Sequence, residues 1–197
     1  MKAALNFVFL VLFAPLTFAE EERTREEWRA QLVEAAREQT RYTLHYDGSY
    51  QRIAYPMGDV PIDRGVCTDV VIRAYRALGK DLQQLVHEDM QAHFALYPKN
   101  WGLSRPDRNI DHRRVPNLQT YFKRFGQSLP VTENSDLQPG DLLTWMLPGN
   151  LPHIGVVSDR RSADGKRPLI IHNIGVGVQE EDALNVAPLT GHYRFIP

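Results

Sequence analysis

The residue types best suited to chemistry are one cysteine and two histidines. Cys67 is the only cysteine in the chain of 197 residues. A thiol nucleophile needs a base to take its proton and a third group to hold that base in one orientation. His153 and His172 fit these two roles, because an imidazole titrates near neutral pH and can carry a proton in both directions. The set predicts attack of a sulfur atom on a carbonyl group.

Cys67 stands where a loop is expected to become a helix. Val70 and Ala74 follow at helical spacing, and Gly79 supplies a stop. The free N–H groups of a helix start favour negative charge, so this position is expected to lower the pKa of the thiol. Asp69 in the same turn opposes a thiolate. The alternative is a buried cysteine that only fills the core.

The beginning of the chain predicts export. Lys2, the apolar run 3–14 and the small residues Thr17 and Ala19 form the pattern of a cleaved signal peptide, 1–19. The apolar run is too short to span a membrane, so we expect a periplasmic or secreted protein with no membrane contact after cleavage. An exported chain with one cysteine cannot form an internal disulfide, which favours a chemical role for the thiol.

The remaining sequence predicts one α+β domain over 20–197. A net charge of -1 gives no reason to expect nucleic acid as a partner. Helical patterns come first and strand patterns follow, which is typical of helices packed on an antiparallel sheet. If the two histidine strands are neighbours, both imidazoles can face the start of the cysteine helix. The expected helices are 24–36, 67–78, 82–96 and 117–125, and the expected strands are 142–146, 153–158, 169–173 and 192–196.

The segment 81–135 is expected to be a helical, arginine-rich insertion, and its loop 98–116 is rich in charged and aromatic residues. Because guanidinium groups clamp carboxylates with two hydrogen bonds, its arginines are candidates for binding an acidic peptide substrate. A solvated surface is the alternative. The four candidates are Arg105, Arg108, Arg113 and Arg114.

The same segment also holds histidines and acidic residues, but in no dense metal-binding motif, so neither a metal nor another cofactor is expected. The scattered residues are His87, Asp89, His93, Asp107, Asp111 and His112.

Four motifs, in this order, resemble those of the NlpC-type cell-wall peptidases, which are papain-like cysteine enzymes of bacteria. They are Cys67 at a helix start, the Leu-x-Pro-Gly-Asp motif at 137–141, the His-Ile-Gly-Val-Val motif at 153–157, and Ile171-His172. Within that superfamily the sequence is similar to an exported family known as domain of unknown function 1287. The resemblance covers 42–196.

The resemblance implies a papain-like fold with Cys67 as nucleophile, His153 as general base and His172 as the group that orients it. Tyr55 and the backbone N–H of Cys67 would stabilise the oxyanion, and the implied substrate is a peptidoglycan stem peptide. The helix here begins Val66-Cys67-Thr68 rather than Asp-Cys-Ser, and the interval from Cys67 to His153 exceeds the superfamily norm. Acyl transfer and non-catalytic binding of wall peptides therefore stay open as alternatives.

Overall fold

The computed structural model describes residues 18–132 and 136–197. The apolar run expected to direct export lies outside these residues. No helix within the described ranges has both the length and the apolar character needed to cross a bilayer.

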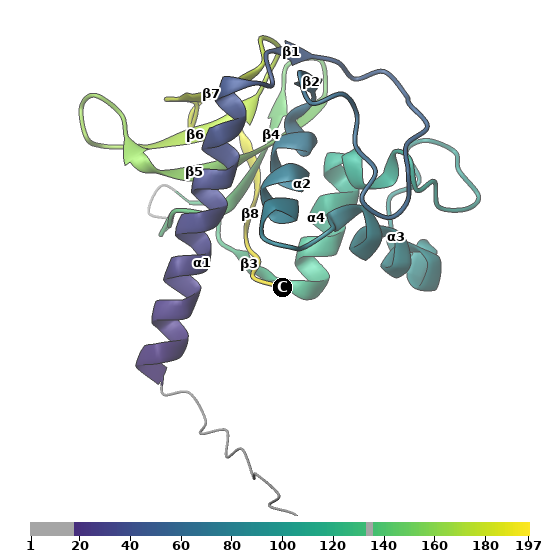
Figure 1. Ribbon diagram of the computed structural model, residues 1–197, viewed down its shortest axis with the longest axis horizontal. Helices are drawn as coiled ribbons and strands as arrows, with labels where there is room; N and C mark the ends of the chain where they lie inside the picture. The colour runs from purple at the N-terminus through teal and green to yellow at the C-terminus, as the bar shows by residue number, and fades with distance from the viewer. Residues whose placement is uncertain (1–17, 133–135) are drawn as a thin grey trace, which may run out of the picture.

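A six-stranded sheet forms the centre of the molecule, and every pairing within it is antiparallel. The expected class, an α+β fold with helices packed on an antiparallel sheet, is therefore confirmed. Four of the strands match expected ones, while β3 and β7 had no expected counterpart. In spatial order the strands are β3 (Gln127–Leu129), β8 (Leu189–Arg194), β4 (Leu142–Leu147), β5 (Leu151–Arg161), β6 (Pro168–Asn173) and β7 (Val178–Glu181) (Figure 1).

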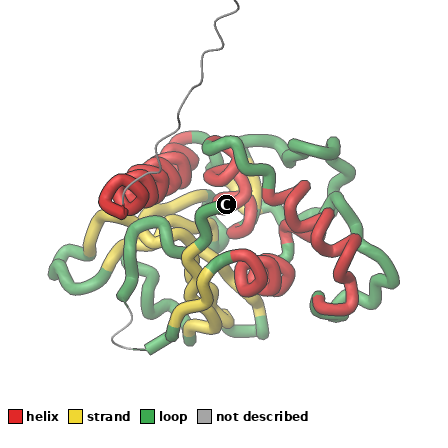
Figure 2. The backbone as a smooth tube through the Cα atoms, turned by 90° about the horizontal axis from the view of Figure 1, so that it is seen from below, coloured by secondary structure: helices red, strands yellow, loops and turns green. Residues whose placement is uncertain are grey.

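Helices α1, α2 and α4 pack against β5 on one side of the sheet, and α3 packs against α2 and α4 (Figures 1 and 2). Short 3-10 turns follow α1 and α3 and precede α4. The helices are α1 (Phe18–Glu38), α2 (Cys67–Ala77), α3 (Leu82–His93) and α4 (Val115–Phe125), and the 3-10 turns are η1 (Gln39–Arg41), η2 (Phe94–Leu96) and η3 (Asp111–Arg113).

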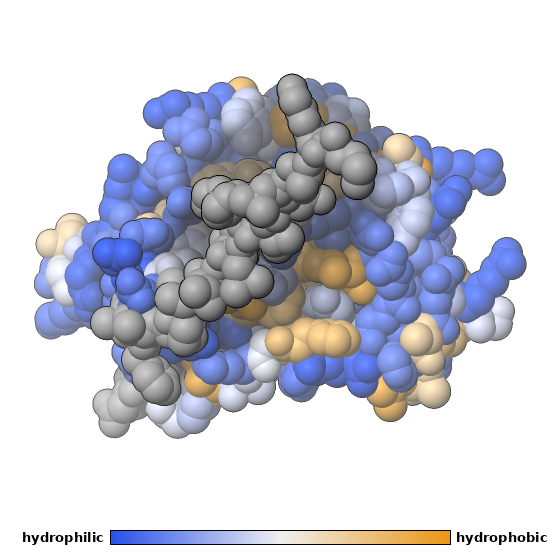
Figure 3. Space-filling model, turned by 60° about the horizontal axis from the view of Figure 1, so that its bottom comes forward, coloured by the Kyte–Doolittle hydropathy of each residue, from blue (hydrophilic) through white to orange (hydrophobic). Residues whose placement is uncertain are grey.

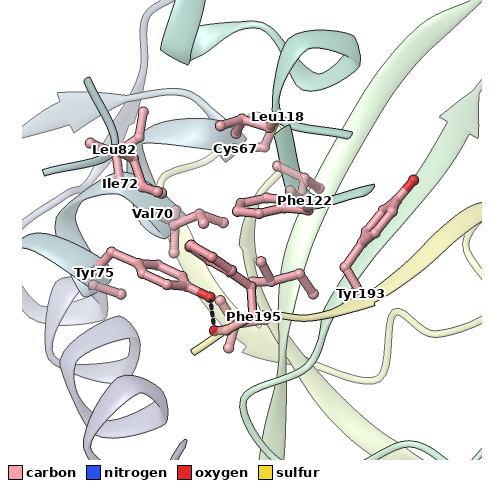
Figure 4. Close-up of a cluster of buried hydrophobic side chains, with 14 of the residues drawn as sticks. Cys67, Val70, Ile72, Tyr75, Leu82, Leu118, Phe122, Tyr193 and Phe195 are labelled. Atoms are coloured by element: carbon pink, nitrogen blue, oxygen red, sulfur yellow. Dashed lines mark hydrogen bonds between the residues drawn. The ribbon is translucent and has the colours of Figure 1, made fainter. Parts of the chain in front are cut away.

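Both faces of the sheet are covered. The larger apolar cluster lies between the helices and the sheet, where Tyr75 stacks on Phe195 and donates its hydroxyl hydrogen to the carbonyl oxygen of Phe195 over 2.8 Å (Figure 4). A smaller cluster around Trp145 and Val157 is covered by the segments near Leu137 and Leu184. The face in Figure 3 is mostly hydrophilic, with apolar patches near its middle.

A second, two-stranded sheet leads into the cysteine helix. Its strands, β1 (His45–Tyr46) and β2 (Arg64–Gly65), are parallel and pair Tyr46 with Gly65. The side-chain amide of Asn173 at the end of β6 donates to the carbonyl oxygen of Gly65 over 3.0 Å. These contacts tie the residues before Cys67 to the large sheet.

Candidate functional site: a cysteine beside a histidine pair

Cys67 is the first residue of α2, as the sequence predicts. Val66 precedes it in an extended conformation, and Oδ2 of Asp69 accepts the N–H of Val66 over 2.7 Å. A side chain in the first turn that accepts a free N–H group fixes a helix start. Backbone N–H groups of Cys67, Thr68 and Ile154 point at the sulfur. The thiol is therefore held where one helix start meets strand β5.

Burial dominates the acidity of this thiol. The side chain is 5% exposed, and Figure 4 shows it beside Leu118 in the larger apolar cluster. Burial, with a smaller contribution from the charge of Asp69, raises the pKa of Cys67 to about 12 although the N–H groups oppose the shift. The expectation that the helix start lowers this pKa was wrong, because removal from water outweighs the helix N–H groups.

His153 and His172 are bound to each other. Nε2 of His153 lies 2.7 Å from Nδ1 of His172, and Nε2 of His172 lies 3.0 Å from Oε1 of Glu181. Both imidazoles are buried. Burial and the neighbouring His172 lower the pKa of His153 to about 3, and burial lowers that of His172 although Glu181 opposes it. Both rings are neutral at pH 7.

The two hydrogen bonds that link Glu181, His172 and His153 determine which nitrogen of each ring carries a hydrogen. A carboxylate only accepts, so Nε2 of His172 carries a hydrogen and its Nδ1 does not. Nε2 of His153 must then donate to Nδ1 of His172, which leaves Nδ1 of His153 without a hydrogen. No hydrogen bond to that atom is formed by any residue of 18–132 or 136–197. His153 therefore keeps one basic nitrogen with a free lone pair.

Cys67 and His153 are associated with adjacent residues of strand β5 but lie toward opposite faces of the sheet. Ile154, whose N–H points at the sulfur, directly follows His153. Successive side chains of a strand leave on opposite faces. Ile154 accordingly packs in the larger cluster with Cys67, whereas the ring of His153 lies 5.7 Å from that of Trp145 in the smaller one. The expectation that both imidazoles face the helix start was wrong, because His153 and His172 alternate along their strands with Ile154 and Ile171, which pack on the side of Cys67.

Gly155 makes room for the histidine pair. A Cβ atom at this position would lie 2.6 Å from Cγ2 of Ile170 and 3.1 Å from Cβ of His172. Both distances are shorter than ordinary van der Waals contact, so any side chain here would push β6 away. The glycine of the His-Ile-Gly motif is therefore a packing requirement of the pair.

The structure places Tyr55 away from the sulfur. Its ring packs against His87 at 5.1 Å, and the loop around it is tied to the C-terminal end of α2 by a hydrogen bond from Arg76 to Gly58. An eleven-residue helix is about 16 Å long, so that end of α2 is far from Cys67. Tyr46, the residue of β1 that pairs with Gly65, is closer in the fold to the start of α2; burial, and to a smaller extent the charge of Cys67, raises the pKa of Tyr46.

The four arginines proposed for substrate binding fall into two pairs. Arg113 is buried and donates two hydrogen bonds, of 2.8 and 2.9 Å, to Asp69. Arg114 pairs with Asp111 and lies 4.0 Å over the ring of Trp101. These two are therefore engaged within the protein. Arg105 and Arg108 line a cavity beside α3.

Asp141 of the Leu-x-Pro-Gly-Asp motif has a structural role. It is fully buried, and it accepts hydrogen bonds from His192 over 2.7 Å and from Arg194 over 2.7 and 2.8 Å. These bonds join the start of β4 to β8. Gly140 before it has a φ of +85°, a backbone conformation that favours glycine. The motif therefore stabilises the junction of β4 and β8 at the centre of the sheet, at a distance from the cysteine.

The acidic residues that were weighed as metal ligands have protein partners. Asp89 binds Arg124 and Tyr97, and Asp107 binds Asn109. Across 18–132 and 136–197, no three histidine, cysteine or acidic side chains are grouped to hold a metal ion.

The comparison with known sequences places this arrangement in a family. The model of a family described as "Domain of unknown function (DUF1287)" matches residues 33–195, which include Cys67, His153 and His172. The chain belongs to this family. It is 56% identical over 165 residues to "Uncharacterized protein YijF" of Escherichia coli (strain K12), a match that covers 83% of this chain and 80% of that protein. No solved structure matches the chain.

Two residues of the site were not predicted from the sequence. Glu181 lies on β7, a short strand whose pattern did not stand out, so its approach to His172 had no sign in the sequence. Tyr46 lies in a strand of only two residues. Tyr46 is nonetheless one of the tyrosines ahead of Cys67. Its neighbours could be known only from the pairing of β1 with β2.

Proposed function

We propose that this protein is a papain-like cysteine hydrolase that cleaves an amide bond, with Cys67 as nucleophile, His153 as general base and His172 as the group that orients His153. The observation that carries the proposal is the order of hydrogen bonds from Glu181 through His172 to His153. This order leaves the lone pair of His153 Nδ1 unused, one residue from the peptide N–H that points at the sulfur.

The resting site is uncharged, so the mechanism starts from a thiol and a neutral imidazole. As the sulfur of Cys67 attacks the carbonyl carbon, Nδ1 of His153 takes the thiol proton. The imidazolium then donates this proton to the amide nitrogen, the carbon–nitrogen bond breaks, and the amine leaves. Water attacks the resulting thioester and gives one proton to His153, which returns it to the sulfur. The acid product leaves and the enzyme is restored.

Transfer of the proton requires the imidazole of His153 and the sulfur to approach. The ring of His153 is packed beside Trp145, and both reacting groups are buried, so binding of the substrate must open this part of the molecule. Loops and lids that complete a site on substrate binding are common among enzymes. For His153 to act as the base, this opening has to bring its Nδ1 atom and the sulfur together while the hydrogen bond to His172 is kept, and His172 and Glu181 would then stabilise the imidazolium.

The oxyanion would be held by the backbone N–H of Cys67 and by the hydroxyl of Tyr46. Tyr46 takes the role expected for Tyr55, because it pairs with Gly65, two residues before Cys67. Two such donors would stabilise the negative charge that develops on the carbonyl oxygen.

We propose a peptidoglycan stem peptide as the substrate, supported by the motifs that the chain shares with NlpC-type peptidases. The test is a digest of purified peptidoglycan with the wild type and Cys67→Ala, read by mass spectrometry. We expect fragments with a new free amine and a new free carboxyl group, formed by the wild type alone. Equal fragments from both proteins, or none from either across a panel of wall peptides, would contradict the proposal.

A second candidate function is binding of wall peptides without cleavage. The observation in its favour is the buried thiol, whose pKa of about 12 leaves almost no thiolate at neutral pH. Binding of a labelled stem peptide to wild type and Cys67→Ala separates the two functions. If both proteins bind equally and neither changes the peptide, binding is the function.

A further inference from the structure

A cavity of about 760 Å³ lies beside α3, apart from the cysteine and the histidine pair. Residues of two loops, near 50–53 and 103–109, line it together with His87 and Gln91 of α3. The side chains of Ile53 and Leu103 give it an apolar part. A concave site with an apolar wall and a few polar groups is typical of a small-molecule site.

The cavity is positively charged. Arg52, Arg105 and Arg108 line it, and none of these guanidinium groups has a hydrogen bond or an ion pair with a residue in the described part of the chain, although that of Arg108 lies 5.6 Å over the ring of Tyr55. One acidic residue, Asp107, also lines it, but its oxygens accept hydrogen bonds from Tyr50 and Asn109. Three positive charges thus face one negative charge that is already engaged, and an anion would balance them.

His87 is a buried polar side chain, and one of its ring nitrogens has no hydrogen-bond partner among the described residues. It is 9% exposed, and its Nδ1 atom is fully buried with no hydrogen-bond partner in the described residues. Burial and the charge of Arg108 lower the pKa of His87, so the ring is neutral at pH 7 and has one nitrogen that donates and one that accepts.

We propose that this cavity binds a small molecule through a carboxylate or phosphate group, with Arg105 and Arg108 holding the oxyanion beside the ring of His87. Arg52 adds charge at the rim, and Ile53 and Leu103 contact the apolar part of the ligand. The guanidinium fork matches the planar geometry of both oxyanions. The site does not depend on Cys67, so it stands or fails separately from the proposed hydrolysis.

The test is titration of the full chain with two probes, N-acetylglutamate for a carboxylate and inorganic phosphate for a phosphate. Binding is followed by calorimetry and by the NMR resonances of the His87 ring. We expect at least one probe to bind and to move the His87 resonances. The double variant Arg105→Gln/Arg108→Gln should weaken binding by about tenfold or more, since it removes charge-assisted hydrogen bonds.

Two controls make the result decisive. Arg23→Gln removes an exposed charge on α1 and should leave binding unchanged, as should Cys67→Ala. Arg108→Lys keeps the charge but not the fork, and should bind more weakly than the wild type. Absence of binding by both probes, unmoved His87 resonances, or wild-type affinity in a folded double variant would overturn the proposal.

Discussion

Nε2 of His153 lies 2.7 Å from Nδ1 of His172, so the two histidines share one hydrogen bond inside the protein. Glu181, on the edge strand β7, accepts a hydrogen bond from the other nitrogen of His172. This bond determines that His153 is the donor and His172 the acceptor in the bond between the two histidines. The carboxylate of Glu181 is half exposed, whereas both rings are buried. A group at the surface thus decides which nitrogen of a buried ring is basic.

Replacing Glu181 by Gln should disturb this order. Glu181 raises the pKa of His172, so Glu181→Gln should lower it further, and the proposed hydrolysis should slow because the tautomer of His153 is no longer fixed. NMR titration of the His172 ring measures the pKa directly. Glu27→Gln, an exposed substitution on α1, is the matched control. A His172 pKa that stays the same or rises would show that Glu181 has no influence on it.

The thiol of Cys67 should react slowly with alkylating reagents in the folded protein. Its pKa of about 12 leaves a small thiolate fraction, and its burial limits access. We expect the labelling rate at pH 8 to rise by several orders of magnitude in urea, where an ordinary thiol has a pKa of about 8.5. Fast labelling of the folded protein at pH 7 would mean that the thiol is open and activated at rest.

The two tyrosines ahead of Cys67 should differ in effect. Tyr46→Phe removes the hydroxyl proposed as an oxyanion donor and should lower kcat by about a hundredfold, the usual effect of losing one such donor. Tyr55→Phe alters a ring that packs on His87 and should leave kcat unchanged. Steady-state kinetics on a stem peptide compare the two. The reverse ranking would restore Tyr55 to the site.

The Asp69–Arg113 pair should be essential for stability. Both side chains are almost fully buried, so Arg113→Met leaves a carboxylate without a counter-charge and should lower the free energy of unfolding by about 3–5 kcal/mol. The double variant Asp69→Asn/Arg113→Met removes both charges and should recover part of the loss. Urea unfolding measures each step. Arg41→Met, in an exposed pair with Glu38, should change little.

Stability should fall as the pH falls below about 6.5. The pKa values of His112 and His153 are lowered to about 3 and that of His172 is also lowered. As the pH falls, these histidines are therefore protonated in the unfolded chain at a higher pH than in the folded protein. Asp111 has the opposite effect on stability, because its pKa is raised to about 6 and the folded protein binds one proton there that the unfolded chain does not. Each net proton changes the free energy of unfolding by about 1.4 kcal/mol per pH unit.

Urea unfolding at a series of pH values from 7.5 to 4.5 measures this slope. His112→Gln should reduce it by about one proton, because it removes a buried ring that resists protonation. A stability that is flat or that increases toward pH 4.5 would contradict these shifts.

Local patterns in the sequence predicted most of the helices and strands. The start of α2 at Cys67 and the strands around His153 and His172 follow from periodicity and turn residues, which act over a few neighbours. Strands β1 and β2 have two residues each, too few for a periodic pattern. Their pairing depends on residues far apart in the sequence, so it could not be predicted.

The candidate site was predicted less completely than the fold, because charges and thiols respond to their surroundings. Arg113 and Arg108 look equivalent in the sequence, yet one meets Asp69 and the other faces a cavity. The same holds for the thiol, whose helix start was visible but whose apolar cover comes from α4. Such partners are set by the tertiary structure alone.

The absent side chain of Gly155 gives a rule for reading other members of the family. Where the next strand lies as close as β6 does here, with Ile170 and His172 against Gly155, a side chain two positions after the strand histidine would force the two strands apart. Alanine at that place would signal that the two rings have separated, and with them the path for the proton. A single methyl group can therefore report, from sequence alone, whether a relative has kept the histidine pair.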